Sequence, residues 1–116
     1  MSWSIHYSPL AEADFEDIQD YIADVLLASE AALRQTVRII KAANSLSEMP
    51  MRYRLYEHEP WRGLGLRVMP VDRYVVLYLP EERENTVHVL RILYGGRDLP
   101  AQLDELRLSQ FEGKEG

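Results

Sequence analysis

Arginines in the middle of the chain are the side chains most suited to binding an anion. Residues 51–97 contain eight arginines and no lysine. A guanidinium is a planar fork of N–H donors that matches two oxygens of a phosphate or carboxylate, whereas an ammonium acts as a point charge. Arg67 and Arg91 each interrupt an apolar stretch that is typical of a strand. The pattern predicts a site for a negatively charged group in this part of the chain.

Alternation of side chains along a strand predicts which face of the sheet carries these two arginines. The residues predicted to share one side of the strand with Arg91 are Val87, Val89 and Leu93. We expect the N-terminal helices to cover the opposite face, which carries Leu66, Leu90 and Ile92. Arg67 and Arg91 would then project from a bare apolar face, and an apolar patch with embedded charge is typical of a binding site.

A purely structural interpretation of Arg91 has equal weight at this point. The guanidinium could pair with a nearby acid such as Glu57, Glu59 or Asp98 while its stem covers the sheet. Surface ion pairs of this kind are common and carry little information about function.

The histidines and the cysteine count give no indication of a metal or cofactor. His6, His58 and His88 lack the spacing of a metal-binding motif, and the chain has no cysteine. We therefore expect no metal and no cofactor.

The elements that would position the arginines follow the order β-α-α-β-β-β-α. Strands are predicted at 3–7, 64–71, 73–79 and 86–94, and helices at 8–27, 30–49 and 101–109. The fold class is α+β, in which an N-terminal helical hairpin packs on one face of a small antiparallel sheet. The first strand is expected at the sheet edge, beside a later strand.

Helical periodicity predicts which side chains of the two long helices are buried. Ser8 and Pro9 form a typical helix start. The first helix is expected to bury Phe15, Ile18, Ile22 and Val25, and the second Leu33, Val37, Ile40 and Ala43. The aspartates expected on or near the solvated side are Asp14, Asp17, Asp20 and Asp24.

Length and charge restrict the class of protein. A chain of 116 residues fits one domain, predicted at 1–110, with a frayed tail at 111–116. The N-terminus lacks the pattern of a signal peptide and no apolar run reaches the length of a membrane span, so we expect a cytoplasmic protein. The net charge of −6 argues against unspecific binding along nucleic acid.

Three segments together resemble the RelE/ParE superfamily of bacterial type II toxin–antitoxin toxins. They are "YSPLAEADFEDIQDYI", "RYVVLYL" and "VLRILYGGRD", and the resemblance covers about residues 4–103. It implies the toxin of a plasmid stabilisation or stress module, which inhibits bacterial growth until a cognate antitoxin neutralises it. The fold implied by the resemblance agrees with the predicted order of elements.

The resemblance favours the ParE-like branch, whose members bind DNA gyrase and perform no chemistry. The long last strand, the "GGRD" turn and the helix after it are similar to ParE toxins. The binding surface would then comprise Arg67, Val89, Arg91, Leu93, Tyr94 and Arg97.

A RelE-like ribonuclease is the first alternative. Such an enzyme cuts messenger RNA on the ribosome without a metal ion, so whether this chain is an enzyme is open. Its catalytic residues would be Arg67, Arg73, Arg91 and Tyr94, with His58 or Glu57 as further proton-transfer groups. However, the lysines that surround RelE-type sites are absent between residues 42 and 113. A non-toxic interaction domain of the same fold is the second alternative.

Overall fold

The computed structural model describes residues 2–96 and 99–104, and the predicted tail lies outside them. The strands are β1 (Ser4–Tyr7), β2 (Arg67–Val71), β3 (Tyr74–Glu81) and β4 (Thr86–Tyr94). The α-helices are α1 (Pro9–Asp20), α2 (Ser29–Asn44), α3 (Trp61–Leu64) and α4 (Leu99–Asp104). A π-helical turn, η1 (Tyr21–Val25), continues α1, and two 3-10 turns, η2 (Ser45–Ser47) and η3 (Pro50–Arg52), follow α2. The predicted α+β order is confirmed, with the short helix α3 added between α2 and β2, where no helix was predicted.

The four strands form one sheet in the order β1-β4-β3-β2. β2, β3 and β4 pair antiparallel, as the short connections between them predict. β1 lies at the edge beside β4, as expected, but it runs parallel to β4. The sheet is therefore mixed, because the chain returns to it only after the helical hairpin.

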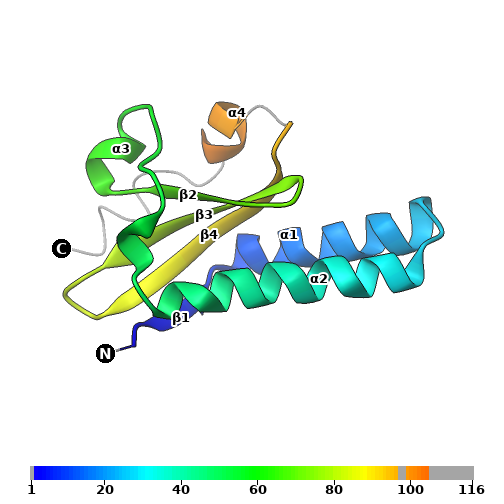
Figure 1. Cartoon of the computed structure of the whole chain (residues 1–116). Helices are drawn as coiled ribbons and strands as arrows, with labels where there is room; N and C mark the ends of the chain where they lie inside the picture. The colour runs from blue at the N-terminus through cyan, green and yellow to red at the C-terminus, as the bar shows by residue number, and fades with distance from the viewer. Residues whose placement is uncertain (1, 97–98, 105–116) are drawn as a thin grey trace.

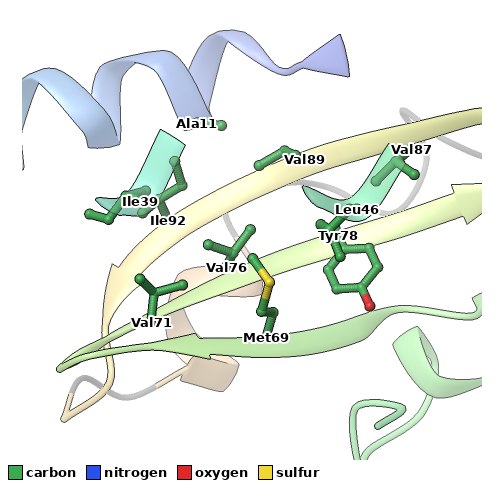
Figure 2. Packing of buried hydrophobic residues seen from close by; sticks show 10 residues of the cluster. All are labelled: Ala11, Ile39, Leu46, Met69, Val71, Val76, Tyr78, Val87, Val89 and Ile92. Atoms are coloured by element: carbon green, nitrogen blue, oxygen red, sulfur yellow. The ribbon is translucent and has the colours of Figure 1, made fainter. Parts of the chain in front are cut away.

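The long helices α1 and α2 lie side by side against one face of the sheet (Figure 1). Ser8 caps α1 by accepting a hydrogen bond from the Ala11 N–H at 3.0 Å, and Pro9 occupies the first turn. The core between helices and sheet is apolar (Figure 2), and its buried residues are Ala11, Ile39, Leu46, Met69, Val71, Val76, Tyr78, Val87, Val89 and Ile92. In the part of the chain that is described, no helix has the length and apolar character needed to cross a membrane.

The inward face of α2 differs from the predicted one. The buried residues of the helix are Ala32, Thr36, Ile39 and Ala43, whereas Leu33, Val37 and Ile40 are 62%, 40% and 40% exposed. Only Ala43 of the predicted inward set is correct. Small side chains let helices approach closely, so the helix turns Ala32 and Ala43 inward and leaves larger apolar side chains outside.

The second face of the sheet is also covered, which contradicts the expected bare surface. α3 and α4 lie on the side of the sheet opposite the long helices (Figure 1). The buried residues of this second core are Tyr56, Trp61, Leu66, Val68, Leu77, Leu90, Leu93 and Leu103. Leu66 and Leu90, predicted to lie beneath the long helices, pack here instead.

A β-bulge explains why strict alternation fails in the second half of β4. Leu77 of β3 is paired with Arg91, but the next residue, Tyr78, is paired with Val89. Leu90 is the extra residue, and an extra residue reverses the inward and outward alternation beyond it. Consequently Val89 and Ile92 both belong to the core beneath the long helices.

Candidate functional site

Arg91 is buried in an ion pair between β4 and α1. Its Nε and Nη2 donate to Oδ2 and Oδ1 of Asp14, each at 2.8 Å. The two side chains are only 6% and 10% exposed. Nη1 of Arg91 also donates to the carbonyl oxygen of Gln102 in α4, at 3.2 Å. The expectation that Arg91 projects from a bare face is therefore wrong, and its structural interpretation is correct in kind, with Asp14 as the acid.

Asp14 completes the hydrogen bonding of the β4 edge where β1 has ended. The Ser8 N–H donates to the Val89 carbonyl at 2.9 Å, and the Ser8 hydroxyl donates to the Leu90 carbonyl at 2.8 Å. Farther along, the Ile92 N–H donates to Oδ2 of Asp14 at 2.9 Å. The start of α1 thus takes over from β1, and it satisfies edge groups that would otherwise be buried without partners.

The prediction that Asp14 lies on or near the solvated side is wrong. Asp14 follows Ala11 by three residues and precedes Ile18 by four, so the helical period places it on the same inward face. The sequence contained this signal. An isolated carboxylate is rarely buried without a partner, so spacing alone did not predict the burial of Asp14. The partner, Arg91, is 77 residues away in the sequence.

Arg67 is half-buried and binds backbone rather than facing an open surface. Its Nη1 donates to the carbonyl oxygens of Met51 and Tyr53, at 3.1 and 2.6 Å. These bonds hold the segment after α2 against β2, where Leu55 also forms an isolated bridge with Arg67. The expectation of an exposed anion-binding guanidinium is wrong for this residue as well.

Two further residues of the predicted binding surface are inaccessible. Val89 is 0% exposed and Leu93 is 4% exposed, each within a different core. Within residues 2–96 and 99–104, both faces of the sheet are covered, so the bare face that they were expected to form is not found there. Arg97, the last member of the predicted surface, lies outside the described residues.

A cleft of about 680 Å³ lies where α1 and η1 meet the ends of β3, β4 and α4. Residues on its walls include Asp17, Tyr21, Tyr74, Tyr94 and Gln102, with the Arg91–Asp14 pair also among its lining. Tyr94 is 47% exposed, and its ring meets the Tyr74 ring edge-on at 5.9 Å between centroids. Among the predicted site residues, Tyr94 is thus accessible.

Tyrosines determine the character of this cleft. Burial raises the pKa of Tyr74, and the neighbouring phenols of Tyr21 and Tyr94 raise it further. The Tyr74 hydroxyl therefore remains a protonated hydrogen-bond donor at neutral pH. Rings with a polar tip are typical of surfaces that recognise another macromolecule.

Arg73 is exposed and precedes Tyr74 of the cleft, and its carbonyl accepts a hydrogen bond from the N–H of Gly95, the residue after Tyr94, at 2.8 Å. Arg73 and Tyr94 thus lie near one another, whereas Arg67 is at the other end of β2. The fourth residue of the predicted catalytic set, Arg91, is held by Asp14. The structure does not bring the four together around one phosphate-sized position.

An exposed apolar stripe on α2 is a second candidate surface. Leu33, Val37 and Ile40 recur at helical spacing, and Ile40 lines a groove of about 290 Å³ between α1 and α2. Phe15 lies in the same groove, beside the exposed carboxylates of Glu12 and Glu16. Exposed apolar residues in a contiguous row are typical of a protein-binding surface.

Comparison with known proteins places this chain among toxins. Residues 5–99 match the family described as ParE toxin of type II toxin-antitoxin system, parDE. No curated protein sequence matches the chain.

Solved structures share the fold at low sequence identity. The chromosomal ParDE toxin–antitoxin system from P. aeruginosa contains a chain with a TM-score of 0.66 and 20% identity, and the match covers 80% of this chain and 96% of that one. The RelBE2 toxin–antitoxin complex from Mycobacterium tuberculosis gives 0.60 and 18%, covering 81% and 99%. The isolated RelE toxin from E. coli gives 0.52 and 9%, covering 92% and 100%. The implied RelE/ParE-like fold is confirmed.

Proposed function

Because the chain belongs to the ParE toxin family of type II toxin–antitoxin systems, we propose that it inhibits growth by binding DNA gyrase and that a cognate antitoxin neutralises it. The family membership supports a toxin, and two of the structural neighbours are toxin–antitoxin assemblies. The proposal also states how the toxin acts: it binds its target and does not cleave RNA.

The buried Arg91–Asp14 pair is the observation that carries the choice of binding over RNA cleavage. A ribonuclease of the predicted type needs cations that meet the extra negative charge of the transition state. Arg91 already binds a carboxylate through two nitrogens, and its side chain is 6% exposed. Freeing it for a phosphate would leave Asp14 as an uncompensated buried charge.

The tyrosine-lined cleft is the surface proposed for the target. Tyr94 and Tyr21 are 47% and 53% exposed, and the exposed cation Arg73 directly precedes Tyr74, a third tyrosine of the cleft. Aromatic residues and arginine are the types that dominate the energetics of protein interfaces. In this proposal Arg73 and Tyr94 are binding residues and not catalytic ones.

The antitoxin is proposed to cover the apolar stripe of Leu33, Val37 and Ile40 together with the groove beside it. An amphipathic helix of the antitoxin would bury the row of apolar side chains, as in other helix-in-groove interactions. Glu12 and Glu16 border the groove, so basic side chains on the antitoxin would complement it.

The target assignment is tested with the purified chain in two assays run in parallel. We expect inhibition of gyrase supercoiling and no cleavage of messenger RNA on translating ribosomes. Arg73→Ala with Tyr94→Ala should weaken gyrase inhibition by about tenfold or more, because a lost anchor commonly costs over about 1.4 kcal/mol. Arg83→Ala is the matched control, since it removes an exposed arginine from the turn at the other end of β3.

Messenger cleavage without an effect on gyrase would replace this proposal with the RelE-like nuclease. Absence of both activities, with no arrest of growth on induction, would support the non-toxic interaction domain.

The antitoxin surface is tested by co-purification with the product of the neighbouring reading frame. Ile40→Lys should reduce binding, because it places a charge in the apolar groove. Leu64→Lys is the matched control, since Leu64 is 37% exposed, close to the 40% of Ile40, but lies on α3 across the sheet. Equal loss of binding in both variants, or in neither, would contradict the proposed surface.

A further inference from the structure

The turn between β3 and β4 brings together two glutamates and a histidine whose spacing in the sequence matches no binding motif. Asn85 adopts a left-handed conformation with φ of 54°, and its N–H donates to the Glu82 carbonyl at 3.2 Å. The chain therefore reverses tightly between Glu81 at the end of β3 and Thr86 at the start of β4. As a result Glu81 and Glu84 lie next to His88, on the following strand.

The ligand-type atoms of these three residues are close enough to share one ion. An oxygen of Glu81, an oxygen of Glu84 and a ring nitrogen of His88 all lie within 4.8 Å of one another. Nε2 of His88 and Oε2 of Glu81 are 3.0 Å apart. Two ligands of one tetrahedral Zn²⁺ ion are about 3.3 Å apart, given metal–ligand distances of about 2.0–2.1 Å. A small outward movement of either side chain would therefore admit the metal.

A second imidazole lies beside the cluster. His6 of β1 is in register with His88 of β4, and the two rings meet edge-on with centroids 5.6 Å apart. His6 is exposed, so its ring can rotate toward the ion without disturbing the core. The cluster thus spans three strands, with ligands or neighbours on β1, β3, β4 and the turn.

Charge and ligand chemistry indicate which kind of ion would fit. Glu81 and Glu84 offer two carboxylates, and the Glu82 carboxylate in the same turn adds negative charge, against the single positive charge of Arg83. Imidazole nitrogen favours zinc and its first-row neighbours over Mg²⁺ and Ca²⁺, which prefer oxygen alone. We propose that Glu81, Glu84 and His88 form a binding site for a divalent transition-metal ion such as Zn²⁺. The site lies at the far end of β3 and β4 from the tyrosine-lined cleft and is independent of the proposed target.

The experiment measures Zn²⁺ binding to the full chain after removal of any histidine tag, which would bind zinc itself. Calorimetry should show one saturable Zn²⁺ per chain, and Zn²⁺ should raise the Tm, because a ligand that binds only the folded state stabilises it. Glu84→Gln and His88→Ala should each weaken the affinity by about tenfold or more, because the loss of a direct ligand costs at least as much as the loss of a group that only supports a ligand. Glu82→Gln is the matched control, since it removes an exposed carboxylate from the same turn without touching the cluster.

Several results would overturn the proposal. They are the absence of saturable binding, equal affinity in Glu84→Gln and Glu82→Gln, or one Zn²⁺ shared by two chains. Because Glu84 is exposed, Glu84→Gln should fold normally and gives a clear result even if His88→Ala does not fold. Neither variant touches the target or antitoxin surfaces, so failure here would leave the proposed function unaffected.

Discussion

Arg91 and Arg38 bind an aspartate in the same way but in different surroundings. Arg38 of α2 donates from Nε and Nη2 to Asp72 at 2.7 and 2.8 Å, and Arg91 donates from the same atoms to Asp14 at 2.8 Å. The Arg91 and Asp14 side chains are 6% and 10% exposed, whereas those of Arg38 and Asp72 are 65% and 30% exposed. From their hydrogen-bond geometry alone, the two pairs would be expected to contribute equally to stability. Solvent decides between them, because water and salt screen the exposed pair while the buried pair depends on each partner's charge.

Removal of Asp14 is the change with the largest expected effect. Asp14→Ala should lower the free energy of unfolding by about 3–5 kcal/mol, because it leaves the Arg91 charge buried without a counterion. Urea denaturation, monitored by circular dichroism, measures the change in the free energy of unfolding. Replacing both partners by apolar residues, Asp14→Leu with Arg91→Met, should recover much of the loss. A loss below about 1 kcal/mol in the single variant would show that water reaches the pair.

Arg91→Lys tests whether the fork matters as well as the charge. A lysine keeps the positive charge but cannot reach both carboxylate oxygens in the planar arrangement of a guanidinium. We expect a loss of about 1.5–3 kcal/mol in the same urea experiment, the usual range for a hydrogen bond to a charged group. Stability equal to that of the unmodified chain would mean that charge alone holds α1 to β4.

Tyr78 extends the comparison to a buried contact without an ion pair. Its hydroxyl donates to the Pro50 carbonyl at 2.6 Å, and the side chain is 0% exposed. Tyr78→Phe should cost about 1–3 kcal/mol at neutral pH, because the buried Pro50 carbonyl loses its donor.

The pH dependence of stability checks the same residue. Burial raises the pKa of Tyr78 from 10.0 to about 12. Between these values the unfolded chain has lost the phenol proton while the folded chain keeps it, so stability falls as the pH rises. Tyr78→Phe should reduce this alkaline loss. An unchanged slope of unfolding free energy between pH 10 and 12 would contradict the assignment.

The exposed pair should show the smallest effect. Hydrogen bonds from Arg38 and then Gln35 lower the pKa of Asp72. Its contribution to stability is therefore present above the unfolded pKa of 3.8 and is lost as the pH falls through the lower folded value. Arg38→Ala should scarcely change the urea midpoint at pH 7, and this change should shrink further in 1 M salt. A loss comparable to that of Asp14→Ala would contradict the role assigned to solvent.

Local patterns in the sequence predicted much of the fold and little of the site. Ser8 with Pro9, and the short turns between strands, correctly predicted where α1 begins and how β2, β3 and β4 pair. The faces of β4 were predicted wrongly for two reasons. The long helices cover the face that carries Val87 and Val89, and beyond the extra residue, Leu90, the alternation is reversed. The face of α2 was predicted wrongly because apolar spacing fitted Leu33, Val37 and Ile40 as well as the true inward set. Of the predicted binding surface, Tyr94 is accessible. Arg67 is bound to backbone, and Val89, Arg91 and Leu93 are buried.

By itself the sequence determined the order of the elements, the class of fold and the family. Caps, turns and periodicity depend on a few neighbouring residues, so they can be recognised before the packing partners are known. The tertiary structure alone decided which side chains meet: Asp14 with Arg91 across 77 positions, and Glu81 and Glu84 with His88 around a turn. Burial and charge pairing depend on these distant contacts. An arginine such as Arg91 can bind an external anion or an internal carboxylate, and the side chains that pack against it decide which.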